Sequence, residues 1–214
     1  MVRITKKPEE RREEIVEAAR VLFLHKGYDS TTMKDIMTHL GIAKGTIYHY
    51  FASKEELLEA VLDCMVAGML NKMHLLHQSS TGDALSRMRF FIERSASDDH
   101  DPEVIERLHQ PGNTGMHLRL LAKMITSQAP LYAALIKQGC DEGIFKTDTP
   151  LESAEFLLAA SQFLTDLGIY PWPQPVLLRR INALPALIEA QLAARPGSFD
   201  FIKDLLATRR IAPD

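Results

Sequence analysis

The segment from Thr31 to Lys54, TTMKDIMTHLGIAKGTIYHYFASK, contains polar and aromatic side chains that suit contact with a nucleic acid. Lysine binds phosphate or guanine, a threonine hydroxyl bonds either group, and tyrosine or histidine contacts phosphate or a thymine methyl group. The alternative is a pair of short solvated helices without a function. Helices this short are poorly stable by themselves, which argues against this alternative. We expect contacts with double-stranded DNA from Thr32, Lys34, Lys44, Gly45, Thr46, Tyr48, His49, Tyr50 and Lys54.

A helix-turn-helix is predicted to position these side chains. The first helix should run from about Met33 to Leu40 and the second from about Lys44 to Tyr50, with Gly41 in a left-handed conformation after the first. Two residue pairs predict capped N-termini, namely Thr32 with Asp35 and Ser53 with Glu56. The apolar residues that should pack the two helices together are Ile36, Leu40, Ile42 and Ile47.

Longer helices are predicted on both sides of this motif. Pro8 suits the first turn of a preceding helix, which Gly27 should end. Its apolar face consists of Ile15, Ala18, Ala19, Leu22 and Phe23. A second long helix should run from after Ser53 to about His77, so that it joins the DNA-binding part to the rest of the chain.

The run from Gly41 to Leu57 strongly resembles the DNA-binding domain of TetR-type transcriptional regulators, and so does the segment from Ile15 to Met37. This resemblance implies a three-helix domain that presents the second helix of its helix-turn-helix to the major groove. It also implies a helical domain that forms a homodimer and binds a small-molecule effector, and a repressor that the effector releases from a palindromic operator. Ala43 departs from the pattern, since serine is frequent there, and this weakens the N-cap by about 1 kcal/mol.

Composition and charge bound the class of protein. Residues 1–54 carry 10 Lys/Arg and 7 Asp/Glu, whereas the remainder carries a net charge of −6, so the positive charge lies on the part expected to meet phosphate. No apolar run reaches the length of a membrane span, and the charged N-terminus is unlike a signal peptide. Cys64 and Cys140 are far apart in the sequence, which predicts two buried thiols and a cytoplasmic location.

The remaining chain is predicted to be helical, so that the whole fold is all-α. Pro130 should interrupt or restart a helix that begins near Met116, and Pro185 should kink a helix from about Gln174 to Ala194. Another helix is expected from about Leu151 to Gly168, and a short one from Phe199 to Thr208. We expect a DNA-binding domain at 1–54 and an effector-binding and dimerisation domain at 55–214.

Two sets of residues are candidates for the functions of the second domain. Flexible methionines and aromatic residues suit an irregular apolar effector, and the resemblance places such a cavity among the central helices. The candidates are Met65, Met69, Met73, Met88, Phe90, Phe91, His117, Met124 and Phe163. A small-residue stripe and an apolar stripe on the last long helices predict the dimer interface, with Ala154, Leu158, Ser161, Thr165, Leu177, Ile181, Leu184 and Ile188.

Enzymatic and metal chemistry have weaker support in the sequence. The cluster Asp98, Asp99, His100 and Asp101 has metal-binding side chains, but consecutive residues rarely converge on one ion. His74 and His77 share a helix face without a third ligand nearby in sequence. No nucleophile–base pair or glycine-rich phosphate loop is evident, so we expect neither catalysis, nor a cofactor, nor a bound metal. The alternative function is a helical small-molecule-binding or interaction protein that does not bind DNA.

Overall fold

The structure is a computed structural model that describes residues 7–96 and 102–210. Helices account for its regular structure, and no strand occurs within these ranges, which confirms the all-α prediction. The chain divides into two compact units. The first comprises Met1–Gly68 with His100–Leu120, and the second comprises Met69–Asp99 with Leu121–Asp214. The boundary predicted at residue 54 therefore lies inside the first unit.

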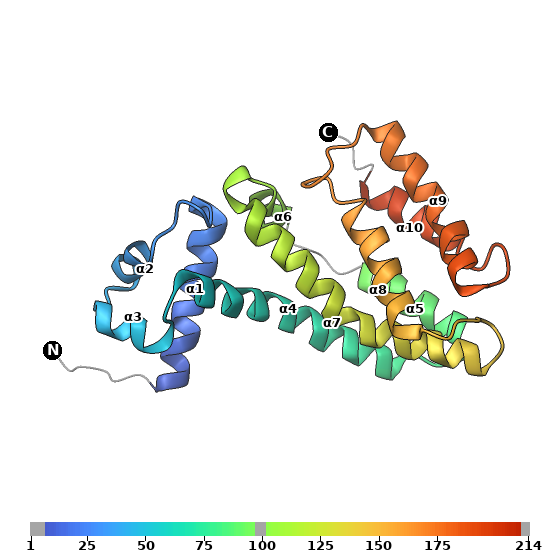
Figure 1. Cartoon of the computed structure of the whole chain (residues 1–214), viewed down its shortest axis with the longest axis horizontal. Helices are drawn as coiled ribbons and strands as arrows, with labels where there is room; N and C mark the ends of the chain where they lie inside the picture. The colour runs from blue at the N-terminus through green and yellow to red at the C-terminus, as the bar shows by residue number, and fades with distance from the viewer. Residues whose placement is uncertain (1–6, 97–101, 211–214) are drawn as a thin grey trace. The chain divides into compact units, whose positions relative to one another are not determined.

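The first unit contains α1 (Pro8–Lys26), α2 (Met33–Leu40), α3 (Lys44–Tyr50), the start of α4 (Lys54–Ser79), α6 (Pro102–Leu108) and the short 3-10 turn η1 (Pro111–Asn113). In Figure 1, α2 and α3 are the short blue helices beside α1. The predicted apolar face of α1 is confirmed, since Ile15, Ala19 and Phe23 are fully buried. Ile36 of α2 and Ile47 of α3 are also fully buried, so both short helices are fixed by their apolar sides.

The second unit contains the C-terminal part of α4, together with α5 (Ala84–Ala96), most of α7 (Thr114–Asp141), α8 (Pro150–Leu158), α9 (Gln174–Leu192) and α10 (Phe201–Arg210). A π-helical turn, η2 (Ala159–Phe163), directly follows α8. Helix α9 packs against both α8 and α10. The core of this unit includes buried side chains of α4, α5, α7, α8, α9 and α10, such as Met88, Phe91 and Leu135, together with Phe145 and Phe199 from the connecting segments.

Helix α7 does not break at Pro130, so the prediction of an interruption there was wrong. Proline lacks the N–H that would bond to the carbonyl of Thr126, four residues earlier. Both Thr126 and Pro130 are exposed, so that carbonyl faces solvent and the helix can continue. Cys64 is also exposed rather than buried as expected. Among the described residues, none of the helices combines the length and the apolar character that crossing a membrane requires.

Replacing Gly139 by alanine is expected to lower the free energy of unfolding by about 1–3 kcal/mol, because it would overpack the core of the second unit. A Cβ atom at Gly139 would clash with Cδ2 of Phe145, whose ring is buried and stacked on Phe199. Urea denaturation measures the change. Gly68→Ala is the matched control, since nothing lies within 4 Å of a Cβ there. Equal unfolding midpoints for the two variants would contradict this packing.

Candidate nucleic-acid interface

The helix-turn-helix is held by local capping, as the sequence predicts. The Thr32 hydroxyl accepts a hydrogen bond from the Asp35 N–H (3.2 Å), and the Thr32 N–H donates to the Asp35 carboxylate (2.8 Å), which together form a capping box. Gly41 closes α2 in the left-handed conformation, with φ 64°. Ala43 supplies no side-chain cap to α3. The start of α3 therefore lacks a side-chain hydrogen bond that α2 has.

Asp35 also connects the start of α2 to the end of α1. Its carboxylate lies 2.8 Å from the Lys26 ammonium. Bonding to Lys26, and then to the Thr32 hydroxyl and N–H, holds the pKa of the Asp35 carboxyl well below its usual value. Asp35 therefore remains charged at neutral pH, which suits both the cap and the positive end of the α2 dipole.

Most of the predicted DNA-contacting side chains are exposed on the first unit. Lys34 lies on α2, while Lys44, Tyr48 and His49 lie on α3, and all four are exposed together with Thr32 and Gly45. The Lys44 ammonium lies 5.6 Å from the centre of the Tyr48 ring. Thr46 and Tyr50 are half-buried, and the Tyr50 ring packs edge-on against His49. The structure thus places all these residues on α2, α3 and the turns beside them.

Lys54 has partners within the first unit. Its ammonium donates to the backbone carbonyl of Tyr28 (2.9 Å), also contacts that of Asp29 (3.4 Å), and lies 4.2 Å from the centre of the Tyr28 ring. Burial raises the pKa of the Tyr28 phenol, with a smaller contribution from the nearby Glu55 carboxylate. Lys54 therefore fixes the turn between α1 and α2, and an ammonium has three N–H donors with which to do so.

Asn113 is a structural residue of this unit that the sequence did not indicate. It is fully buried, its Oδ1 accepts from the Tyr28 N–H (2.8 Å), and its Nδ2 donates to the carbonyls of Arg107 (2.9 Å) and Leu24 (3.4 Å). The backbones of Gly27 and Gly112 also approach closely there. We call this set of Asn113 contacts the Asn113 clamp. The only signal in the sequence was the loop-forming run PGNTG, which cannot reveal a contact 85 residues away.

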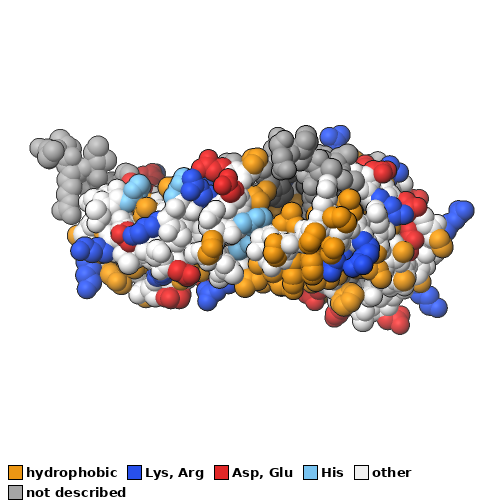
Figure 2. All heavy atoms as spheres, turned by 90° about the horizontal axis from the view of Figure 1, so that it is seen from above, with side chains coloured by type: hydrophobic (Ala, Val, Ile, Leu, Met, Phe, Trp, Pro, Cys, Tyr) orange, Lys and Arg blue, Asp and Glu red, His pale blue; other side chains and the backbone are white. Residues whose placement is uncertain are grey.

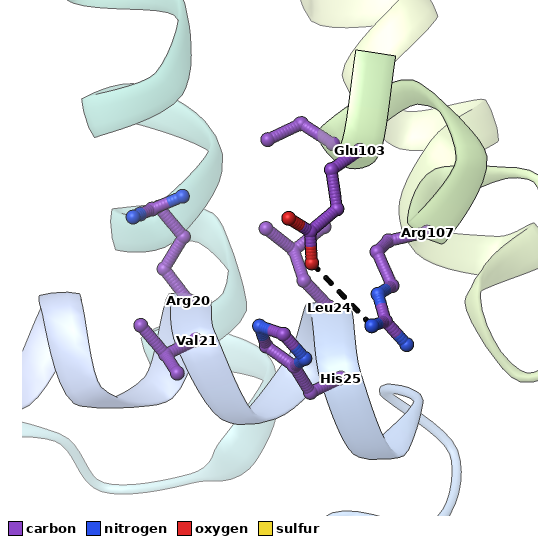
Figure 3. A pocket seen from close by; sticks show the side chains of 7 residues that line it. Arg20, Val21, Leu24, His25, Glu103 and Arg107 are labelled. Carbon is purple, nitrogen blue, oxygen red and sulfur yellow. Dashed lines mark hydrogen bonds and ion pairs between the residues drawn. The ribbon is translucent and has the colours of Figure 1, made fainter. Parts of the chain in front are cut away.

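A small hollow lies between α1 and α6 in the first unit (Figure 3). Its volume is about 140 Å³, below the roughly 300–1,000 Å³ that is usual for sites that bind drug-sized molecules. Arg107 pairs with Glu103 across one turn of α6 (3.4 Å), and the Arg20 guanidinium pairs with Glu17 on α1. Arg20 and Arg107, which line the hollow, thus each pair with a carboxylate on their own helix.

The predicted effector-binding residues divide between the two units. Met65 and His117 belong to the first unit, where the His117 ring lies 5.1 Å from that of His109. The second unit contains Met69, Met73, Met88, Phe90, Phe91, Met124 and Phe163. Met73, Met88 and Phe91 are buried in its core. A separate hollow of about 510 Å³ in this unit is lined by other residues, which are Asp83, Leu85, Gly143, Ile144, Ala193, Ala194, Arg195 and Ser198.

The predicted dimer-interface residues mostly pack inside their own chain. The buried ones are Ala154, Leu158, Thr165, Leu177, Ile181 and Leu184, while Ser161 and Ile188 are half-buried. Different apolar side chains of the same segments are exposed, notably Phe156 (64%) on α8 and Leu187 (61%) on α9. Leu151, Leu164 and Leu167 are also exposed. Hydrophobic side chains gather over a large part of the face shown in Figure 2.

The two metal hypotheses have different outcomes. Asp98, Asp99, His100 and Asp101 lie outside the described residues. His74 and His77 are both on α4, where His74 is exposed. The His77 ring packs edge-on against Phe91, and burial, followed by the charge of Arg87, lowers its pKa. The His77 ring thus packs against the core of the second unit, while its Nε2 is buried without a hydrogen-bond partner among the described residues.

Comparison with known proteins gives two family matches and several relatives. Residues 15–61 match the family "Bacterial regulatory proteins, tetR family", and residues 97–186 match "Tetracyclin repressor-like, C-terminal domain". The HTH-type transcriptional regulator YfiR of Bacillus subtilis is 28% identical over 78% of this chain and 85% of its own length. The HTH-type transcriptional repressor KstR2 of Mycobacterium tuberculosis is 27% identical over 71% of this chain and 78% of its own.

Solved structures agree with this fold. A TetR-family transcriptional regulator from Pectobacterium atrosepticum is 20% identical, covers 87% of this chain and 98% of its own, and has a TM-score of 0.61. SmeT in complex with triclosan is 19% identical, covers 89% and 94%, and has a TM-score of 0.58. The family matches span more than half of the chain and include the helix-turn-helix described above. The chain therefore belongs to the TetR family and is a DNA-binding transcriptional regulator.

Proposed function

We propose that the protein is a homodimeric repressor that binds a palindromic operator and is released from it by a small apolar or amphipathic effector. The observation that carries the DNA-binding part is the exposed set of Lys34, Lys44, Tyr48 and His49 on two short helices. The opposite sides of these helices are anchored by the fully buried Ile36 and Ile47. An exposed polar face on a rigidly held helix-turn-helix is the arrangement that enters a major groove.

The contacts with DNA divide into base reading and phosphate binding. Lys34 and Thr46 lie near the N-terminal ends of α2 and α3, so we assign them to base edges. Tyr48, Tyr50 and Thr32 are assigned to phosphates, and Lys44 to either. Lys54 would reach phosphate through the N–H that remains after its bonds to the carbonyls of the α1–α2 turn.

The dimer would form through the exposed apolar residues of α8 and α9 rather than through the buried stripes of the same helices. Phe156 and Leu187 are the most exposed of these residues, and Leu164 and Leu167 follow η2 in the same unit. Exposed apolar patches on an otherwise polar surface mark sites of association. A two-fold dimer then presents two DNA-binding units to the two halves of a palindrome.

Effector binding and operator binding would oppose each other through α4. This helix begins at Lys54 in the first unit and continues beyond Met69 and Met73 in the second, so a ligand beside the methionines displaces a helix that the DNA-binding unit shares. A coupling free energy of about 1–3 kcal/mol would lower operator affinity roughly 5- to 150-fold, and operator would weaken effector binding by the same factor.

The test is binding of the full chain to a DNA duplex from upstream of its own gene, measured by fluorescence anisotropy at several salt concentrations. Specific binding should exceed binding to a scrambled duplex by about 10³-fold or more. Equal affinity for the two duplexes would instead favour the alternative, a helical small-molecule-binding protein without sequence-specific DNA binding.

Gly45→Ala is expected to weaken operator binding about tenfold without destabilising the protein. Nothing lies within 4 Å of a Cβ at Gly45, and alanine favours a helix by up to about 1 kcal/mol relative to glycine. The added methyl group would stand between the start of α3 and the base edges. Anisotropy and thermal unfolding are measured together. Gly115→Ala, also without a close neighbour, is the control, and an unchanged operator affinity for Gly45→Ala would remove α3 from the groove.

A further inference from the structure

Three side chains of the second unit, the buried Gln128 and the half-buried Met69 and Gln162, form a hydrogen-bonded chain that links α4, α7 and the π-helical turn η2. Gln128 of α7, which is 4% exposed, donates through Nε2 to the sulfur of Met69 on α4 (3.3 Å). Gln162 of η2 donates through its Nε2 to Oε1 of Gln128 (2.8 Å). The other end of the Gln162 amide, Oε1, is buried and has no hydrogen-bond partner among the described residues.

The thioether of Met69 determines which way this chain points. Sulfur in a thioether accepts a weak hydrogen bond and cannot donate one. The NH2 group of Gln128 therefore faces Met69, and its carbonyl oxygen faces Gln162. This carbonyl needs a donor, so Gln162 turns its own NH2 group toward Gln128 and its oxygen away. The polarity that Met69 sets thus leaves an acceptor, rather than a donor, at the end of the chain.

The local backbone explains why Gln162 occupies this position. A π-helical turn is an uncommon interruption of a helix and is frequent at functional sites. Two hydroxyl groups of this region donate to backbone carbonyls four residues earlier: Ser161 to Leu157 (2.7 Å) and Thr165 to Ser161 (2.5 Å). These hydroxyls are thus directed at the backbone, and Gln162 is the side chain of η2 whose polar end lies against α7.

A buried acceptor without a partner destabilises a protein, and native interiors contain few of them. Leucine or methionine at residue 162 would remove this acceptor but would leave the buried Gln128 carbonyl without the donor that Gln162 provides. We propose that Gln162 Oε1 receives a hydrogen bond from the effector, so that this protein selects neutral amphipathic ligands that carry a hydroxyl or N–H donor. This inference rests on the proposed function, in which the second unit holds the effector. Ethers lack the donor, and carboxylates would direct a negative charge at an acceptor.

Matched pairs of probes test this selection. Triclosan is a chlorinated phenol, and its O-methyl ether replaces the donor hydrogen by a methyl group; 2-naphthol and 2-methoxynaphthalene form a second pair. Calorimetric titration of the full chain should show each phenol binding about tenfold more tightly than its ether, the ratio expected from one hydrogen bond. Equal affinity within both pairs, or no binding of any of the four probes, would overturn the proposal.

Variants separate the acceptor from general packing. Gln162→Met should reduce the preference to less than about twofold while the ethers still bind, although it also removes the donor to Gln128 Oε1. A merely structural Gln162 would instead leave the preference for phenols at its wild-type value in this variant. Met69→Leu should also reduce the preference, because Gln128 is then no longer oriented. Gln191→Met, an exposed position on α9, is the control and should retain the wild-type preference.

Operator release is measured in parallel, so that release of the operator by an effector and the role of Gln162 are tested independently. Phenol-selective binding that leaves the operator bound would contradict release by the effector but support the role of Gln162. Operator release by phenols and ethers at equal concentrations would support release and contradict the role of Gln162. Persistence of the phenol preference in Gln162→Met would place the donor contact at another residue and overturn the proposal.

Discussion

The double variant Phe156→Glu/Leu187→Glu is expected to be a folded monomer whose operator affinity is lower by about two to four orders of magnitude. Both side chains are more than half exposed in the single chain, so glutamate at these positions does not disturb its core. Within a dimer interface the same glutamates would be buried charges without partners, which strongly disfavours association. A monomer then binds with one DNA-binding unit and loses the contribution of the second.

Analytical ultracentrifugation and anisotropy measure this result. Leu75→Glu is the matched control, because Leu75 is 66% exposed and lies on α4 rather than on α8 or α9. It should remain dimeric and bind the operator normally. By contrast, Leu158→Glu should unfold the second unit, since Leu158 is only 6% exposed. A double variant that stays dimeric at micromolar concentration would move the interface away from Phe156 and Leu187.

Asn113→Ala is expected to lower the free energy of unfolding by about 2–4 kcal/mol. The substitution would leave the Tyr28 N–H and the carbonyls of Leu24 and Arg107 without the partner that Asn113 provides. Asn113 immediately precedes α7, which continues into the second unit. In the variant, an effector should therefore lower operator affinity less than it does in wild type. Denaturation and operator competition measure the two effects.

Two further variants define the Asn113 result. Gln110→Ala changes an exposed residue of the same segment and should have wild-type stability. Asn113→Asp keeps an acceptor for the Tyr28 N–H but loses both donors, so it should be about as unstable as the alanine variant. Wild-type stability of Asn113→Asp would show that the two donated bonds contribute little and that the Tyr28 contact alone matters.

Local signals predicted the DNA-binding elements well. The helix ends are set by capping pairs and by Pro8, Gly27 and Gly41, whose effects extend over only a few neighbouring residues. The structure places α1 to α4 within about two residues of the predicted bounds. The exposed side chains of α2 and α3 follow from the same periodicity. Whether they contact DNA as assigned stays a prediction.

Features that depend on distant contacts were not predictable in the same way. Periodicity identifies the buried face of α9, which includes Leu177 and Ile181, but does not say whether that face packs on its own chain or on another copy. The contacts of Asn113 and Lys54 with Tyr28 join residues that are 85 and 26 positions apart. The orientation of the Gln162 amide depends, through Gln128, on Met69 of α4, and no local sequence pattern indicates it.

The discontinuity of the first unit has a consequence for the synthesis of the protein. Residues up to Gly68 supply α1 to α3, but Leu108 and Asn113, which are buried in the same unit, come from the stretch His100–Leu120. At about 5–20 residues per second, the ribosome needs roughly 2–9 s to translate from Gly68 to Asn113. The helix-turn-helix therefore leaves the ribosome exit tunnel before its Asn113 clamp exists. Nascent chains should acquire stable DNA-binding units late in translation, and a fragment that ends near residue 68 should be markedly less stable than the full chain.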